Sequence, residues 1–439
     1  MIRKNPKGSQ RRILPLLPPH VLRLVAVRGL RSFSQGYLNI IAPLYLLSIG
    51  LSVVGLGLLF TASFVTGAVL LVPVGKLADK YGRKPFLIAF SVLIALWGSL
   101  YLVTTWIPLL FLISAIAGIG RGGSAGGSQA GPFAPAEQAI LADLVPSERR
   151  VSVFSINAFA ASMLAAAGAA LSAAPSFIHL QYLGGDKLLF AITVLLGVVS
   201  CFILLGVPET RRPGVDAQGE PPPRKKSSRS LMRSRESTSI VGKLSLAAMV
   251  NSFGMGFMGS SLFVIWLNLR YHLGADVIGP VFALSYFLSA LTILGAPALA
   301  RQIGSVRSII ATRIAAAGLL AAIVLAPTYL PAIGLYVGRV VLSNMIVPVR
   351  QSFTMGLFPS EERATASGVT GAARRVTGAV SPSISGELMD AGYLESPLVI
   401  GALLQGFSAV LYGIFFLKKD DLQQRNSEFE NNNNTKPSG

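Results

Sequence analysis

Arginine side chains lie inside several of the chain's long apolar runs, where charge is costly. Arg121 lies roughly 20 Å from the start of its run at about 1.5 Å per residue, and Arg339, Arg374 and Arg375 also lie well inside theirs. An ionisable side chain at such depth usually faces a cavity or a partner. Guanidinium groups bind anionic groups through paired hydrogen bonds, so these residues are candidates for an anion site.

Other polar side chains lie at similar depths or nearer the ends of the runs. The amides are Gln35, Asn39, Asn157, Asn251 and Asn344. Such groups either line a solvated path or form hydrogen bonds between helices, and the sequence leaves both alternatives open. Arg28 and Arg31 lie near one end of the first run, where long side chains usually reach the headgroups.

Titratable groups that could carry a proton are scarce inside the runs. Proton-driven transport normally uses a carboxylate or histidine within the membrane. Glu137 lies near the inner end of the fourth run and Glu387 near the outer end of the eleventh, and no carboxylate or histidine lies in the middle of a run. If transport is coupled to protons, we expect Glu137 or Glu387 to be the carrier.

The apolar runs indicate a membrane protein. Of the 439 residues, 52% are hydrophobic and 13% charged, whereas soluble domains carry about 25% charged residues. A hydrocarbon core of ~30 Å needs about 20 apolar residues per helix, with every backbone group bonded internally. We predict an all-α membrane protein with twelve transmembrane helices, at residues 22–47, 52–74, 86–105, 108–134, 151–174, 188–207, 244–268, 277–300, 307–327, 331–352, 365–389 and 398–417.

The basic residues give the orientation. The formal net charge is +19, and Lys and Arg gather in alternate breaks between the runs, as in 76–84 and 211–235. By the positive-inside rule both chain termini are cytoplasmic. The charge therefore indicates a lipid bilayer and no nucleic acid as partner. Cys201 is the single cysteine, so we expect no disulfide and no cysteine-based metal site.

A polar segment divides the runs into two sets of six. We expect a cytoplasmic tail over 1–21, a six-helix bundle over 22–207, a flexible linker over 208–243, a second bundle over 244–417 and a disordered tail over 418–439. The halves share short repeats. Residues 135–150 match 348–363, and Gly82 matches Gly304 after the second run of each half. The sequence therefore predicts two pseudo-symmetric bundles related by duplication.

The segment "GKLADKYGRKP" (75–85) lies between the second and third runs. Its glycines allow a tight turn, and Asp79 is a single acid among four bases. The segment resembles the loop signature of the major facilitator superfamily, G-x-L-A-D-[RK]-x-G-[RK]-[RK], and with twelve runs and a central basic linker the resemblance covers nearly the whole chain. Arg121 and residues 135–150 most resemble the drug:proton antiporter branch, although the fifth run lacks the contiguous Gly-Pro of that branch.

The resemblance implies roles for individual residues. In the superfamily, spans 1, 4, 7 and 10 line a central cavity, and we place on the substrate path Gln35, Asn39, Arg121, Asn157, Asn251, Trp266, Arg339, Asn344, Arg374 and Arg375. The resemblance also implies a conformational latch facing span 11, formed by Gly75, Asp79, Gly82, Arg83 and Lys84. Glu137 or Asp143 would extend the latch by pairing with Arg83 or Arg149.

We therefore expect a monomeric secondary transporter of a small molecule in the plasma membrane, working by alternating access without cofactor or metal. Proton-coupled efflux of hydrophobic compounds is the first interpretation, since Phe253, Met258, Phe263 and Trp266 suit a plastic apolar pocket. Uptake or exchange of an organic anion at the deep arginines is the alternative. A membrane enzyme or a sensor would need a catalytic constellation or a folded soluble domain, and we identify neither in the sequence.

Overall fold

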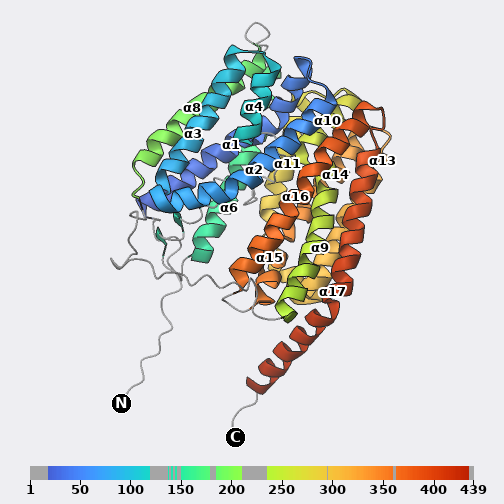
Figure 1. Cartoon of the computed structure of the whole chain (residues 1–439). Helices are drawn as coiled ribbons and strands as arrows, with labels where there is room; N and C mark the ends of the chain where they lie inside the picture. The colour runs from blue at the N-terminus through green and yellow to red at the C-terminus, as the bar shows by residue number, and fades with distance from the viewer. Residues whose placement is uncertain are drawn as a thin grey trace.

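The computed structural model describes residues 18–118, 137, 140, 141, 144, 145, 150–177, 184–209, 235–293, 295–358 and 362–434. Every regular element among them is a helix (Figure 1). The helices are α1 (Pro19–Ser48), α2 (Val53–Tyr81), α3 (Lys84–Val103), α4 (Ile107–Ala117), α6 (Arg150–Leu171), α7 (Ala174–Phe177), α8 (Gly185–Leu205), α9 (Arg235–Phe257), α10 (Ser260–Tyr271), α11 (Ala275–Ile293), α12 (Ala296–Ile303), α13 (Ser305–Val324), α14 (Tyr329–Met345), α15 (Val347–Gly356), α16 (Arg363–Asp390) and α17 (Ser396–Asn434).

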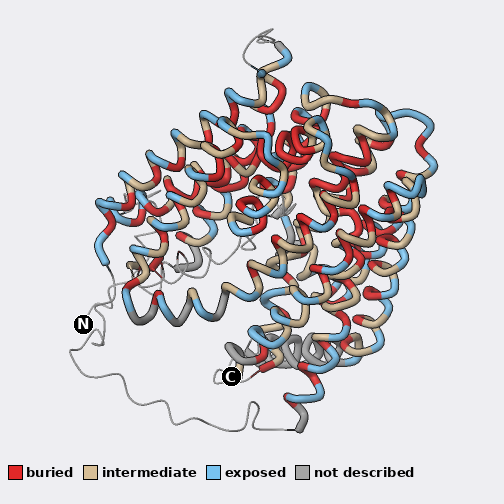
Figure 2. Tube along the Cα trace, turned by 45° about the horizontal axis from the view of Figure 1, so that its top comes forward, coloured by how far each residue is buried: buried red, intermediate tan, exposed pale blue. Residues whose placement is uncertain are grey.

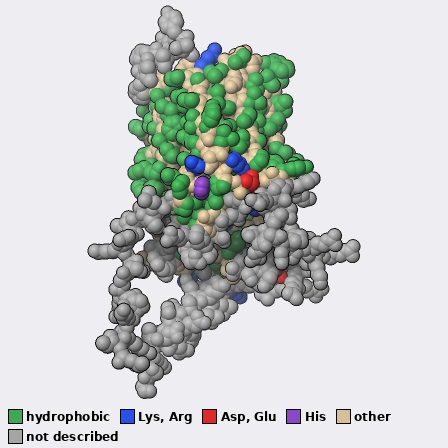
Figure 3. Space-filling view, turned by 90° about the vertical axis from the view of Figure 1, so that its left-hand side faces the viewer, with side chains coloured by type: hydrophobic (Ala, Val, Ile, Leu, Met, Phe, Trp, Pro, Cys, Tyr) green, Lys and Arg blue, Asp and Glu red, His purple; other side chains and the backbone are tan. Residues whose placement is uncertain are grey.

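Each of the twelve predicted spans contains one or two of these helices, and the all-α prediction is confirmed. Within the described ranges, nine segments are long and apolar enough to cross a membrane. Helix α4 has 11 residues, whereas α1 and α16 have 30 and 28 residues but are more polar. Figure 3 shows the outer surface that results, a broad band of hydrophobic side chains with charged side chains at its margins.

Three spans consist of two helices each, although the sequence predicts them as single helices. In the seventh, α9 ends at Phe257 and α10 begins at Ser260. In the tenth, α15 follows α14 after Ile346, because Pro348 has no N–H to donate to the preceding turn. The eighth is made of α11 and α12. These breaks are corrections to the predicted spans.

Two helices extend into segments that the sequence assigns to a linker and a tail. Helix α9 begins at Arg235, inside the linker predicted over 208–243, and α17 continues to Asn434, inside the tail predicted over 418–439. The added residues, 418–434, include two each of Lys, Gln and Glu beside five Asn, which are weaker helix formers. They extend a helix that is already nucleated. Residues 210–234 and 435–439 lie outside the described part of the chain.

Two bundles, α1–α8 and α9–α17, converge at one end, the top of Figure 1. We call this end of the molecule the far end. The opposite end, where α1 begins and α17 ends, is called the termini end. The largest buried cluster lies at the far end and joins both bundles, with Tyr37 and Trp97 from the first and Phe263 and Tyr336 from the second. At the termini end each bundle has a buried cluster of its own. In Figure 2 the buried residues lie on the inward faces of the helices.

Glycine lets the bundles touch backbone to backbone at the far end. A Cβ added to Gly57 of α2 would lie 2.5 Å from the carbonyl oxygen of Pro382 in α16. Beside this contact, the Ser383 hydroxyl donates to Thr61 Oγ1 at 2.6 Å. A Cβ on Gly279 of α11 would meet the α6 backbone at 2.8 Å. Small residues at such seams permit the close approach on which helix association in membranes depends.

Proline interrupts the hydrogen bonding of α16 at this seam. Pro382 lies inside the helix and has no N–H for the carbonyl of Gly378, four residues earlier. The Ser381 hydroxyl donates to that carbonyl instead, at 3.4 Å. Helix α9 packs against the same turn, where a Cβ on Gly256 would lie 2.9 Å from the Gly378 oxygen.

Glycines at matching positions of the two halves have the same backbone conformation. Gly82 follows α2 with φ 99° and ψ 154°, and Gly304 follows α12 with φ 92° and ψ 156°. Residues with a Cβ rarely adopt a positive φ of this kind. The two turns agree with the repeat that the sequence predicts.

Replacing Gly57 by valine should open the far end. The added methyl groups overlap the α16 backbone, and overpacking of this kind costs about 1–3 kcal/mol. The distance between Thr61 and Ser383 reports on the seam, so cysteines at both positions, in a Cys201→Ser background, should form a disulfide in high yield. We expect Gly57→Val to lower that yield.

Gly371→Val in α16 is the control, because a Cβ at Gly371 meets no atom within 4 Å. The cross-linking yield of this variant should match that of the double-cysteine protein with no glycine replaced. Equal yields for Gly57→Val and Gly371→Val would contradict the tight seam.

Candidate functional site

Two arginines and a glutamate form a buried ion cluster in the first bundle. Arg28 Nη1 lies 3.1 Å from Glu137 Oε1, and Arg31 Nη2 lies 2.9 Å from Glu137 Oε2. Asn157 Nδ2 donates to Glu137 Oε1 at 3.4 Å. All four side chains are buried, and Glu137 is only 2% exposed. The cluster joins α1, the fourth span and α6.

The charges of this cluster sum to +1. Each arginine donates to a different oxygen of Glu137, so a proton on Glu137 would remove the negative charge that faces both guanidinium groups. Removing one partner of a buried ion pair is strongly destabilising, because the other charge stays buried. The cluster therefore fixes the first, fourth and fifth spans relative to one another.

The sequence analysis names Glu137 but assigns it other partners. Arg83 and Arg149 are the predicted partners, and Arg28 and Arg31 are expected to reach the headgroups. The structure pairs Glu137 with Arg28 and Arg31, which are 6% and 8% exposed. The prediction missed them because it judged depth along each run separately. The spacing of three residues, which places both arginines on one helix face, was the available signal.

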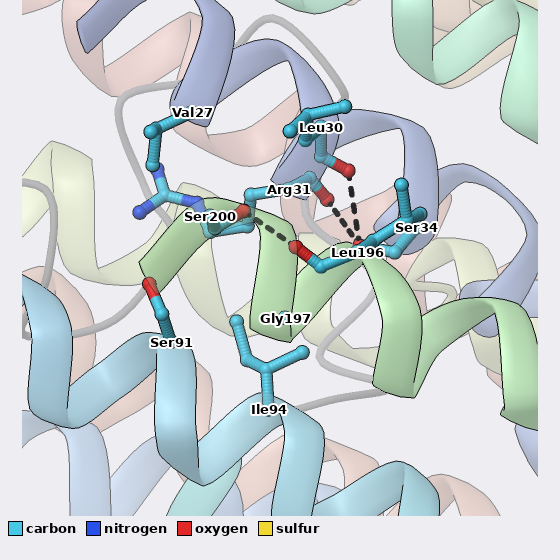
Figure 4. Close-up of a pocket in the computed structure, with 9 residues that line it drawn as sticks. All are labelled: Val27, Leu30, Arg31, Ser34, Ser91, Ile94, Leu196, Gly197 and Ser200. Atoms are coloured by element: carbon cyan, nitrogen blue, oxygen red, sulfur yellow. Dashed lines mark hydrogen bonds between the residues drawn. The ribbon is translucent and has the colours of Figure 1, made fainter. Parts of the chain in front are cut away.

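A small cavity lies beside Arg31, between α1, α3 and α8 (Figure 4). Its volume is ≈ 10 Å³, about the space that one water needs. Ser34, Ser91 and Ser200 line it, and each hydroxyl donates to a backbone carbonyl of its own helix at 2.9, 3.0 and 2.7 Å. The oxygen lone pairs of these serines can accept from a water that Arg31 also contacts, so the cavity can hydrate the ion cluster.

Among the arginines of the second bundle whose side chains are described, five are buried or half-buried: Arg313 in α13, Arg339 in α14, Arg350 in α15, and Arg374 and Arg375 in α16. The first two are buried, and the others are half-buried. Within the described ranges, none of the five forms an ion pair with a carboxylate. The acids of this bundle whose side chains are described lie at helix ends, and they are Asp276, Glu362, Glu387, Asp390 and Glu395.

Arg313 has two described partners in one helix. Its Nη1 donates to Ser408 Oγ at 3.1 Å, and its guanidinium carbon lies 5.1 Å from the centre of the Tyr412 ring. Both partners come from α17. Arg350 and Arg374 are its charged neighbours. Helices α13 and α15, which carry Arg313 and Arg350, both contribute residues to the buried cluster at the termini end.

The basic loop between α2 and α3 is bound to the end of α8. The backbone N–H groups of Arg83 and Lys84 donate to the two carboxylate oxygens of Glu209, both at 3.1 Å, and Lys84 Nζ donates to Leu205 O at 2.8 Å. A carboxylate at a helix N-terminus satisfies free N–H groups and complements the helix dipole. The sequence analysis missed Glu209, although it directly follows the sixth run. The surroundings of Gly75 and the side chain of Asp79 lie outside the described residues, so the latch across to span 11 stays a prediction.

The predicted amides have varied surroundings. Asn157 belongs to the ion cluster, and Asn344 Nδ2 donates to Ser289 Oγ at 3.2 Å, between α14 and α11. Asn251 Nδ2 contacts Met255 Sδ within α9 at 3.3 Å. The backbone carbonyl of Asn39 accepts from Ser261, across the two bundles, at 3.1 Å. For Asn157 and Asn344 the observed contacts are interhelical hydrogen bonds, and Gln35 is half-buried in α1.

The aromatic residues of the seventh span lie in the protein core. Trp266 is 1% exposed, and its ring centre lies 5.4 Å from that of Phe263. Phe263 in turn stacks on Tyr336 at 3.7 Å. Phe257 and Met258 are also buried. Met258, Phe263 and Trp266 belong to the far-end cluster, and a role for Trp266 on the substrate path stays a prediction.

Of four further predicted residues, one lies in the described part of the chain. Arg121 lies outside the described residues, as do the side chains of Arg149 and Asp143. Glu387 is exposed near the far end of α16. Of the two candidate proton carriers, Glu137 is therefore the buried one.

Comparison with known proteins identifies the family. The profile of the Major Facilitator Superfamily matches residues 24–382. The chain belongs to the major facilitator superfamily. A similar protein is the uncharacterized membrane protein YJR124C of Saccharomyces cerevisiae, 24% identical over 421 residues that cover 89% of this chain and 92% of that protein.

Solved structures of superfamily transporters share this fold. A bacterial homologue of the human lysosomal transporter Spinster, in an inward-facing and unoccupied conformation, is 16% identical and has a TM-score of 0.67 over 92% of this chain and 99% of that chain. The inward-open xylose transporter XylE from E. coli is also 16% identical, with a TM-score of 0.67 over 91% and 96%. Secondary transport of a small molecule by alternating access is therefore the general function of this superfamily member.

Replacing Glu137 by glutamine should strongly destabilise the protein. The substitution leaves Arg28 and Arg31 buried without their counter-charge, and such a loss costs about 3–5 kcal/mol. Thermal unfolding of the purified protein in detergent should show a clear fall in Tm. The double variant Glu137→Gln with Arg28→Gln restores the net charge of +1 and should recover part of the loss.

Glu395→Gln provides the matched control. Glu395 pairs with Arg270 at 3.5 Å, but these side chains are 40% and 50% exposed, and exposed pairs contribute only about 0–1 kcal/mol. If Glu137→Gln shifted Tm no more than Glu395→Gln, the ion cluster would have no role in holding the bundle.

Proposed function

We propose that this superfamily member transports a small organic anion, with arginines of the second bundle as its binding groups. One observation carries the proposal. The helices of that bundle contain five described arginines that are buried or half-buried, and its described acids lie at helix ends. A buried guanidinium needs a negative or strongly polar partner, and a transported anion would supply one during each cycle.

The contrast between the bundles supports this assignment. In the first bundle the protein itself supplies the negative charge, since Glu137 pairs with both Arg28 and Arg31. In the second bundle Arg313 has Ser408 and Tyr412 as contacts, and both are neutral. Guanidinium groups match carboxylates and phosphates in charge and in hydrogen-bond geometry.

The proposal favours the anion over the hydrophobic drug of the first interpretation. A plastic drug pocket requires adaptable side chains that face a cavity, and Phe263, Trp266 and Met258 are instead packed in the far-end core. Drug efflux, the antiporter branch and the direction of transport stay predictions from the sequence.

We further propose the orientation and the location. The distribution of basic residues places both termini in the cytoplasm, and in that orientation the structure is closed on the outside and faces inward. The plasma membrane is the proposed location and a monomer the proposed state. For proton coupling, Glu137 is the proposed carrier, acting in a state where Arg28 or Arg31 has moved away from it.

Arg374→Gln should weaken anion binding. Hydrogen bonds to charged groups contribute about 1.5–3 kcal/mol, so we expect a loss of roughly 10- to 150-fold in affinity. The measurement is the rise in Tm of the purified protein with increasing glycerol 3-phosphate, succinate or benzoate, followed by uptake of the best probe into proteoliposomes.

Arg270→Gln is the control, because Arg270 is an exposed arginine at the far end and already pairs with Glu395. It should leave the affinity unchanged. Stabilisation by none of the anions, or the same affinity in Arg374→Gln as in the unsubstituted protein, would overturn the proposal.

A further inference from the structure

Two basic side chains from neighbouring helices meet at the end of α8. Arg23 Nη1 of α1 donates to the carbonyl oxygen of Gly206, and Lys84 Nζ of α3 donates to that of Leu205 at 2.8 Å. The two acceptors belong to consecutive residues, whose Cα atoms are about 3.8 Å apart. A Cβ added to Gly206 would lie 2.8 Å from Arg23 Cζ, so the guanidinium group lies directly on this turn. We call these four residues the α8 patch.

The contacts with α8 use only part of the hydrogen-bonding capacity of the two side chains. A guanidinium group has five N–H donors and an ammonium group has three. Among the described residues each of these side chains has one acceptor. Arg23 is exposed and Lys84 is half-buried, so their remaining donors can bind a negative group from outside the protein.

The carboxylate beside the α8 patch is already bound to the main chain. Both oxygens of Glu209 accept from backbone N–H groups, those of Arg83 and Lys84, at 3.1 Å. Arg83 also adds a basic side chain to this loop. With three basic residues, Arg23, Arg83 and Lys84, and one carboxylate, the described charges around the patch are positive overall.

Apolar side chains adjoin the α8 patch on the lipid-facing surface. Phe202 and Leu205 lie in the last turn of α8 and are 69% and 59% exposed, and Leu22, next to Arg23 in α1, is 57% exposed. Figure 3, seen from the side of α3 and α8, shows basic and acidic side chains together at the lower margin of the hydrophobic band. The protein thus presents positive charge and apolar surface to the same place in the membrane.

We infer that the α8 patch binds the headgroup of an acidic phospholipid. Phosphate oxygens accept hydrogen bonds from guanidinium and ammonium groups, and the acyl chains would lie against the adjoining apolar side chains. In the proposed orientation the patch lies at the cytoplasmic leaflet, whose anionic lipids attract basic residues near its surface. A bound lipid would bridge Arg23 of α1 and Lys84 of α3 over the end of α8.

The test compares phosphatidylglycerol with phosphatidylcholine of the same acyl chains, by native mass spectrometry of the purified protein in detergent. The choline group adds a positive charge that the α8 patch repels. We therefore expect phosphatidylglycerol to bind at least about ten-fold more tightly, a factor that one charged hydrogen bond can supply. Arg23→Gln should lower the affinity for phosphatidylglycerol roughly ten-fold by the same reasoning, and Arg23→Lys should retain most of it.

Lys243→Gln is the matched control, because Lys243 is an exposed basic residue of α9, in the second bundle. Its affinity for phosphatidylglycerol should equal that of the unsubstituted protein. If Lys243→Gln lost as much affinity as Arg23→Gln, the lipid would be held by general charge attraction and the α8 patch would not be its site.

Two measurements on the unsubstituted protein decide the matter even if Arg23→Gln does not fold. Equal affinity for the two lipids would overturn the inference. Glycerophosphoglycerol, the soluble headgroup without acyl chains, should fail to displace the lipid at similar concentrations. Displacement by this probe would identify a site for a free phosphate diester and would also overturn the inference of a lipid site.

Discussion

A guanidinium group buried between transmembrane helices must be matched by negative charge or by strong hydrogen-bond acceptors, and the two bundles meet this constraint in different ways. The first bundle contains its own carboxylate, so α1, the fourth span and α6 are held together by an internal ion cluster. In the second bundle a hydroxyl and an aromatic ring hold Arg313. The two bundles thus differ in electrostatic character, because a carboxylate faces the arginines of the first and neutral groups contact Arg313 in the second.

The contact between α2 and α16 at the far end depends on a second constraint, the lack of a side chain at its glycine. Where Gly57 meets Pro382, backbone touches backbone, and the shared cluster around Phe263 and Tyr336 fills the space beside it. The termini end has separate cores in each bundle, so the bundles can separate there without exposing a shared core. Closing the termini end therefore requires a new interface between the bundles. The basic loop at Lys84, which Glu209 holds, lies near the membrane margin and is placed to join that interface.

Composition and periodicity predict the fold well, because a membrane imposes length and apolarity on every span. They also single out the arginines and Glu137, since charges are rare in such runs. They fail where partners come from distant segments: nothing local to Glu137 identifies Arg28, and nothing in the loop identifies Glu209. The breaks within the seventh and tenth spans were missed as well, because apolarity continues across Gly259 while the helix does not.

The proline in α16 has a mechanical consequence. The carbonyl of Gly378 is satisfied by the Ser381 hydroxyl and not by a backbone N–H, so this turn has a lower bending stiffness than the turns on either side. The part of α16 beyond it is clamped by Gly57, and the part before it carries Arg374 and Arg375. Helix α16 can therefore bend at this turn. Its first part, with the two arginines, can change direction while its second part keeps its contact with Gly57.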